Sequence, residues 1–287
     1  MSQAFGQEGR RPRVDRTRMW AVTRNDLRQL AGSPDFWAPM LVLAALFFVV
    51  IPVILLLTIT SLGSVPTVQK VSSALDLLPQ AAQAAVRGDT PADRTTYALA
   101  VYLFAPLAVI VPMTISTAVG ANTLVGEREK GTGEFLAHSP ASEREIYLGK
   151  LIASLVPGYV TTLVGFGIYS LAVNLIVGPQ VGGWFFPTQA WWILMLWVVP
   201  PFLAITLSVV LRLSARVKSA AAAQQASGLV TLPLIVLSYG QSSGALLGAG
   251  GRSGLVLGAF AWMAAIVGLT RGARAVTRAR LLGVDTP

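Results

Sequence analysis

Cysteine is absent from this chain, and histidine occurs once, at position 138. Without cysteine there is neither a disulfide nor a thiol nucleophile, and a single histidine argues against histidine-based metal sites and Ser-His-Asp triads. The sequence also has no Gly-x-Ser-x-Gly elbow and no P-loop. We therefore expect no catalytic residue, no metal site and no bound cofactor in this chain.

Charged residues are scarce as well. They make up 12% of the 287 residues, against 54% hydrophobic residues, whereas a soluble domain has about 25% charged residues. The charges cluster and leave long uncharged runs, and about 20 apolar residues suffice to cross a bilayer as a helix. The pattern predicts an all-α, polytopic membrane protein with six transmembrane helices. The predicted spans are 37–61, 97–124, 148–177, 190–211, 219–240 and 254–271.

The basic residues are distributed unevenly between the two sides of this arrangement. Of the 22 Lys and Arg residues, 18 fall in the segment before the first span, in the loops after the second and fourth spans, and in the tail. The positive-inside rule places these segments, and both termini, in the cytoplasm. We expect the protein to lie in a bacterial cytoplasmic membrane. The net charge of +9 then reflects topology and contact with lipid headgroups, not nucleic acid binding.

The predicted domain organisation is simple: residues 1–13 are disordered, and residues 14–287 form a single transmembrane domain. Within the latter, residues 15–31 are typical of an amphipathic helix lying in the membrane interface, although a plain basic leader is the alternative. Trp20, Thr23, Leu27 and Leu30 share its less polar face. Ser33 and Pro34 then suit the N-cap and first position of the next helix.

Two segments on the predicted outer side are distinguished by their composition. An aromatic cluster precedes the fourth span and is expected to form an interfacial belt; it comprises Trp184, Phe185, Phe186, Trp191 and Trp192. The glycine-rich residues 241–253 are compatible with a flexible outer loop or with a re-entrant helical segment, and the sequence leaves both open.

The spans themselves are poor in ionisable residues. They contain Lys150 and Arg271, both near span ends. Because coupled transporters usually carry ionisable residues at membrane depth, this argues against a self-powered secondary transporter. Several prolines fall inside the spans, where they are expected to kink helices; they are Pro106, Pro112, Pro157, Pro200, Pro201 and Pro233.

The cytoplasmic loop between the second and third spans contains a short predicted helix. Gly131 is a suitable helix stop and Thr132 a suitable N-cap for a new helix. Ser142 and Glu145 have the spacing of a capping box that would start the third span. The short helix would expose Phe135 and Leu136 to water, which favours a docking surface for a partner.

The order of residues in this loop is similar to that of a known protein family. Glu-Arg-Glu-Lys-Gly-Thr-x-Glu-Phe-Leu at 127–136, Ser-Pro-Ala-Ser at 139–142 and Gly-Lys at 149–150 together resemble the permeases of ABC-2 type exporters. Residues 25–30 are similar to the connecting helix of that family. The segment from 214 to 225 is similar to a second cytoplasmic signature in one branch of it. With the six-span layout, the resemblance covers nearly the whole chain.

The resemblance implies a short coupling helix that transmits ATP-driven closure of a separate ABC ATPase to two permease subunits. The implied coupling residues are Glu127, Arg128, Glu129, Lys130, Gly131, Thr132, Glu134, Phe135 and Leu136. Those of the second cytoplasmic loop are Arg212, Arg216 and Lys218. Gly133 departs from the larger residue usual in the family, which puts the start of the coupling helix in doubt. ATP and Mg would bind to the partner ATPase.

Three functions are compatible with the sequence. The first is an export permease, paired with an identical or homologous second permease. The second is a membrane-anchoring or assembly subunit that docks a cytoplasmic partner without transport. The third is an intramembrane enzyme, which the missing nucleophile and metal ligands disfavour. The uncharged spans weakly favour a hydrophobic or amphiphilic substrate, and the sequence does not name it.

Overall fold

A bundle of long helices forms the described part of the protein. The computed structural model describes residues 14–62, 80–129, 138–214 and 252–272, with the single residues 222 and 225. Throughout these ranges the chain forms helices and no β-strand. Residues 1–13, the predicted fifth span at 219–240 apart from residues 222 and 225, and most of the glycine-rich segment lie outside them.

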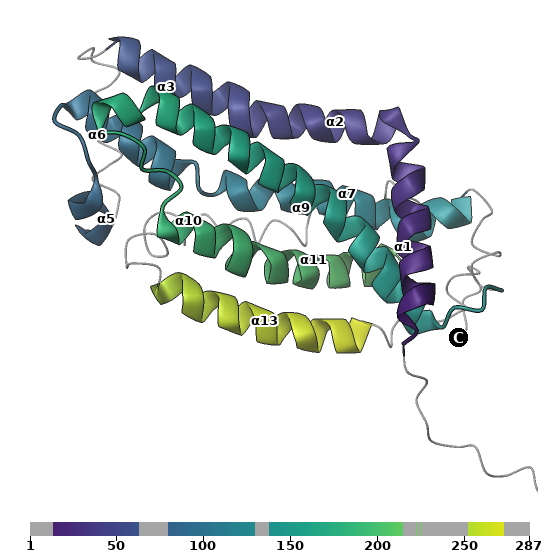
Figure 1. Ribbon diagram of the computed structural model, residues 1–287. Helices are drawn as coiled ribbons and strands as arrows, with labels where there is room; N and C mark the ends of the chain where they lie inside the picture. The colour runs from purple at the N-terminus through teal and green to yellow at the C-terminus, as the bar shows by residue number, and fades with distance from the viewer. Residues whose placement is uncertain are drawn as a thin grey trace, which may run out of the picture.

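The long helices lie side by side, and α1 lies across one end of the bundle (Figure 1). The α-helices are α1 (Arg16–Ala31), α2 (Pro34–Ala45), α3 (Ile51–Leu62), α5 (Gln80–Ala85), α6 (Pro91–Ala98), α7 (Leu107–Glu129), α9 (Glu143–Ile176), α10 (Gln189–Ile193), α11 (Val199–Ser214) and α13 (Arg252–Gly272). Shorter turns are the π-helical η1 (Leu46–Val50), η3 (Leu99–Leu103) and η5 (Leu194–Val198), and the 3₁₀ turn η4 (Gly178–Gln180).

Five continuous helical stretches are long and apolar enough to cross a membrane. They are Trp37–Ser61, Pro91–Thr123, Glu143–Ile176, Gln189–Ser214 and Ser253–Arg271. These stretches coincide with five of the six predicted spans. The remaining one, the fifth predicted span at 219–240, stays a prediction. The second and third stretches begin about one to two turns earlier than predicted because capped helical turns precede their uncharged runs.

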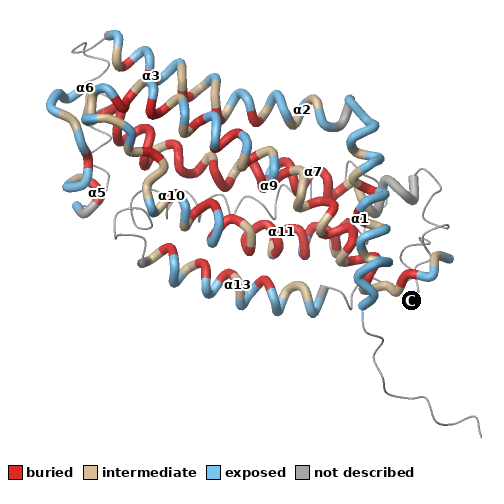
Figure 2. Tube along the Cα trace, in the orientation of Figure 1, coloured by how far each residue is buried: buried red, intermediate tan, exposed pale blue. Residues whose placement is uncertain are grey.

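The bundle has an inner and an outer set of helices. Most of the stretch ending in α7, and most of α11, is buried, whereas the α2–α3 stretch and α13 expose most of their residues (Figure 2). Many of the exposed residues are large and apolar, including Val42 and Ile54 of the first stretch and Phe260 of α13. An apolar surface of this extent suits lipid and not water. The protein is a multi-pass membrane protein.

Prolines explain three irregularities in the helices. The π turns η1, η3 and η5 are each followed, within three residues, by Pro52, Pro106 and Pro200 respectively. In each case the residue four positions before the proline lies in the π turn. A proline ring clashes with that carbonyl and donates no hydrogen bond to it, so a wider turn relieves the conflict. Pro112 and Pro157 instead lie inside α7 and α9 without a π turn.

The junction between α1 and α2 is a sharp turn. Asp15 caps α1 by accepting a hydrogen bond from the Thr17 amide at 2.8 Å. Ser33 occupies the predicted N-cap position of α2, but its hydroxyl donates to the Gln29 carbonyl at 3.0 Å. The predicted N-cap position is therefore correct, but the Ser33 side chain bonds back to α1 and does not cap α2. Pro34 begins α2 as expected.

The loop between α9 and α10 is held by one amide side chain. Asn174 Oδ1 accepts hydrogen bonds from the backbone N–H groups of Phe185 and Phe186, at 3.0 and 3.1 Å. This folds Phe186 into the bundle, where it is 4% exposed beside Trp191, which is 1% exposed. The prediction that the whole aromatic cluster forms an interfacial belt is therefore wrong for these two. Trp184, at 73% exposure, retains that surface position.

At Gly158, α9 packs closely against α7. A Cβ atom at this position would lie 2.9 Å from the Pro112 carbonyl oxygen and closer still to the Ser116 hydroxyl. Gly167, on the same helix, has no atom within 4 Å of the equivalent point. Substitutions at these two glycines can therefore distinguish the effect of helix packing on stability from the effect of helix propensity.

We expect Gly158→Ala to destabilise the protein and Gly167→Ala to be neutral or mildly stabilising. Both substitutions remove the same glycine penalty, about 1 kcal/mol in a helix interior, but only the first forces α7 and α9 apart, at a cost of about 1–3 kcal/mol. Thermal unfolding of the purified variants in detergent measures the difference. Equal unfolding temperatures would contradict the close helix contact.

Candidate functional site

The candidate site lies where α7 ends and α9 begins, with α1 packed against the start of α9. The chain from Lys130 to Ala137, which joins α7 to α9, lies outside the described residues, and the described chain resumes at His138. The flanks of the predicted coupling segment are therefore visible. The α9 flank is joined to α1 by hydrogen bonds and an ion pair, and Lys150 of α9 also bonds to Thr123 of α7.

Glu145 caps two helices at once. Its Oε2 accepts a hydrogen bond from the Ser142 amide at 2.8 Å, and the Glu145 amide donates in return to the Ser142 hydroxyl at 3.3 Å. This is the capping box predicted for the start of the third span, and it is confirmed. Glu145 Oε1 accepts a further hydrogen bond from the backbone amide of Asp15 at 2.7 Å. One carboxylate thus binds the N-cap amides of both α9 and α1.

Arg18 adds a second connection at the base of the loop. Its Nη1 donates to the Pro140 carbonyl at 2.9 Å, and its Nε lies 3.5 Å from Asp15 Oδ2. Both charged side chains are about half exposed, so the ion pair itself contributes little. The bond to Pro140 instead fixes the loop backbone just before α9 against the first turn of α1.

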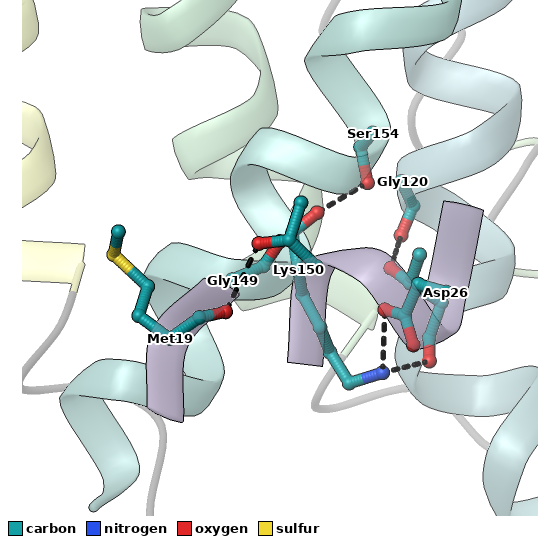
Figure 3. Close-up of polar contacts among 8 residues, drawn as sticks. Met19, Asp26, Gly120, Gly149, Lys150 and Ser154 are labelled. Carbon is teal, nitrogen blue, oxygen red and sulfur yellow. Dashed lines mark hydrogen bonds and ion pairs between the residues drawn. The ribbon is translucent and has the colours of Figure 1, made fainter. Parts of the chain in front are cut away.

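Further along, α1 and α9 approach so closely that a side chain would not fit between them. A Cβ atom on Gly149 would lie 2.9 Å from Val22 Cβ and 3.0 Å from the Met19 carbonyl oxygen. The buried Thr23 hydroxyl lies 3.1 Å from both the Met19 and Gly149 carbonyl oxygens. A single hydroxyl hydrogen therefore serves a carbonyl on either helix (Figure 3).

Lys150, the residue after Gly149, forms a buried ion pair with Asp26. Lys150 Nζ donates to Asp26 Oδ2 at 3.2 Å and to the Thr123 carbonyl at 3.1 Å (Figure 3). The Lys150 side chain is 1% exposed and that of Asp26 is 8% exposed. An ion pair this deeply buried has lost its hydration, so each charge depends on the other. Through one ammonium group, α9 is joined to α1 and to α7.

The second predicted cytoplasmic group is divided by the described ranges. Arg216 and Lys218 lie outside them, and Arg212 lies near the end of α11. Arg212 Nη2 donates to the Gly268 carbonyl of α13. The structure thus places Arg212 between α11 and α13, and its described contact is with another span of this chain.

Comparison with known protein families identifies the family of this chain. Residues 20–249 match the model of the ABC-2 family transporter protein. The chain belongs to the ABC-2 transporter family. An ABC-2 permease is a membrane transport component that is not itself catalytic and that typically works with an ABC ATPase. No curated protein matches the sequence.

The predicted coupling residues of this ABC-2 permease remain predictions. Glu127, Arg128 and Glu129 form the last turn of α7. The others lie outside the described residues; they are Lys130, Gly131, Thr132, Glu134, Phe135 and Leu136. Across the described ranges, no cluster of three or more His, Asp or Glu residues could hold a metal ion.

Sequence reasoning missed the pairing of Asp26 with Lys150. It placed Thr23, Leu27 and Leu30 on the less polar face of α1 and assigned that face to lipid headgroups. In the structure this face is occupied in part by α9, and Asp26 belongs to it, while Trp20, expected on the same face, is 55% exposed. The available signal was that Asp26 lies four positions from an apolar residue on either side, Val22 and Leu30, and so shares their helix face.

We expect Lys150→Met to destabilise the permease strongly, because it leaves the Asp26 carboxylate buried without its partner. Removing one member of a buried pair costs about 3–5 kcal/mol, whereas replacing both with apolar residues is often close to neutral. The double variant Asp26→Leu/Lys150→Met should therefore recover most of the lost stability. A double-mutant cycle of thermal unfolding measures the coupling, and additive effects would contradict it.

Proposed function

We propose that the chain is the membrane subunit of an ATP-driven exporter in a bacterial cytoplasmic membrane, with both termini in the cytoplasm. It pairs with a second permease subunit, and a separate ABC ATPase supplies the energy. The observation that carries this proposal is the network around Glu145 and Lys150, which joins the α9 flank of the 130–137 loop to α1 and, through Lys150, to α7. A loop anchored in this way suits the transmission of force from a docked partner.

The proposed path of force follows the bonds of this network. A partner that presses on the loop displaces the end of α7 and the start of α9 together, because Lys150 bonds to Thr123 across the two helices. The capping contacts of Glu145 make α1 follow α9. Since α7 and α9 pack closely at Gly158, they would move as one unit against the remaining spans, as in shear motions of packed helices.

The proposed substrate is hydrophobic or amphiphilic. Within the described membrane stretches, Lys150 is paired with Asp26. The other charged residues all lie near stretch ends; they are Asp93, Arg94, Glu143, Arg144, Glu145, Arg212 and Arg271. A path between such helices offers few charged groups to replace the hydration of an ion, which makes ion passage costly. An amphiphile loses less on entering it.

The absence of cysteine permits a direct test of orientation. Asp89 and His138 are both exposed, on opposite sides of the second predicted span. We expect a membrane-impermeant maleimide to label Asp89→Cys in intact cells, and to label His138→Cys only after the membrane is opened. The wild-type chain is the unlabelled control. Labelling of His138→Cys in intact cells would overturn the proposed topology.

The docking prediction concerns Phe135 and Leu136. If they insert into a groove on the ATPase, Phe135→Asp should remove about 1.5–3 kcal/mol of binding, or roughly tenfold to hundredfold in affinity. Lys130→Ala, a change at the exposed rim, should cost at most about 1 kcal/mol. Co-purification of the ATPase and substrate-stimulated ATP hydrolysis measure the difference, with membrane insertion as the control.

Two outcomes would argue against this assignment. Full ATPase recovery and full coupled activity in Phe135→Asp would show that these residues do not dock the ATPase. An intact complex that hydrolyses ATP without moving any amphiphile across a vesicle membrane would favour the alternative, a membrane-anchoring or assembly subunit.

A further inference from the structure

A groove of about 410 Å³ lies between α11 and α13 on the outside of the bundle. Its walls are mainly apolar, and the polar groups collect toward the C-terminal ends of both helices. The lining residues that matter here are Val209, Arg212, Met263, Val267, Gly268 and Arg271. Val209, Met263 and Val267 are 37%, 55% and 47% exposed, so the described residues leave the apolar wall open.

Two arginines face this groove where the helices end. Arg212 is fixed by its Nη2 bond to the Gly268 carbonyl, and its buried Nε has no hydrogen-bond partner among the described residues. Arg271 is exposed in the last turn of α13. None of the described residues that line the groove is acidic. The groove therefore pairs a fixed positive end with a long apolar wall.

We propose that this groove binds an anionic phospholipid from the leaflet that meets the C-terminal ends of α11 and α13. Its phosphate contacts Arg212 and Arg271, and one acyl chain lies along Val209, Met263 and Val267. Basic pockets between transmembrane helices are suited to acidic headgroups, and guanidinium groups form strong charge-assisted hydrogen bonds with phosphate.

The dimensions favour a lipid over an acidic peptide. Met263 precedes Arg271 by eight residues, which is about 12 Å along the helix axis. The groove therefore extends from the headgroup level well into the hydrocarbon region. A peptide backbone at that depth would have unsatisfied polar groups, whereas an acyl chain would not. This inference does not depend on the ATPase partner, because it concerns the relation of this chain to lipid alone.

The test compares lipid retention by the purified full-length permease. The protein, exchanged into detergent with equal amounts of phosphatidylglycerol and phosphatidylcholine, is examined by native mass spectrometry. We expect the wild type to retain phosphatidylglycerol preferentially and Arg271→Gln to lower that preference about fivefold. Arg24→Gln, which removes an exposed arginine of α1, is the matched control and should retain it. Arg271→Lys should keep most of the preference.

A second variant separates binding from folding. Arg212 also joins α11 to α13, so Arg212→Gln would change helix packing as well as lipid binding, and it is not used as the test. Val267→Trp instead fills the apolar wall without altering charge, and it should lower retention of the acidic lipid while leaving the elution profile of the protein unchanged. Equal retention of both lipids by the wild type, or equal effects of Arg271→Gln and Arg24→Gln, would overturn the proposal.

Discussion

The Lys150 ammonium is the contact on which the arrangement of α1, α7 and α9 depends. It bonds to a carboxylate of α1 and a carbonyl of α7 while belonging to α9. Neither charge reaches water, so separation of the helices would leave an ion without hydration or partner. A packing contact between apolar side chains can slide at little cost, but this one holds the three helices in one register.

A second connection to α9 fixes the orientation of α1. Glu145 holds the start of α1 near the start of α9, and Lys150, about one and a half turns further along α9, bonds to Asp26 of α1. Two attachment points along one helix prevent rotation about either. The π turns lie elsewhere, in the stretches through η1, η3 and η5. The rigid junction and the locally widened helices thus occupy different parts of the bundle.

Much of this fold follows from local sequence. Uncharged runs located five long apolar helices within a few residues, and the Ser142–Glu145 spacing identified a capping box that the structure confirms. Both signals lie within one element. The Asp26–Lys150 pair joins positions 124 apart, and the burial of Trp191 depends on how a loop folds back. Such features arise from tertiary packing, which no local pattern encodes. The coupling residues themselves stay predictions.

The distance in sequence between Asp26 and Lys150 has a consequence for biogenesis. At about 5–20 residues per second, a ribosome needs roughly 6–25 s to pass from one position to the other. Throughout that interval α1 has been made and its partner has not, so the Asp26 carboxylate stays hydrated at the membrane surface. α1 can dock only after the third span has been inserted, so the junction cannot close before about half of the 287 residues have been made.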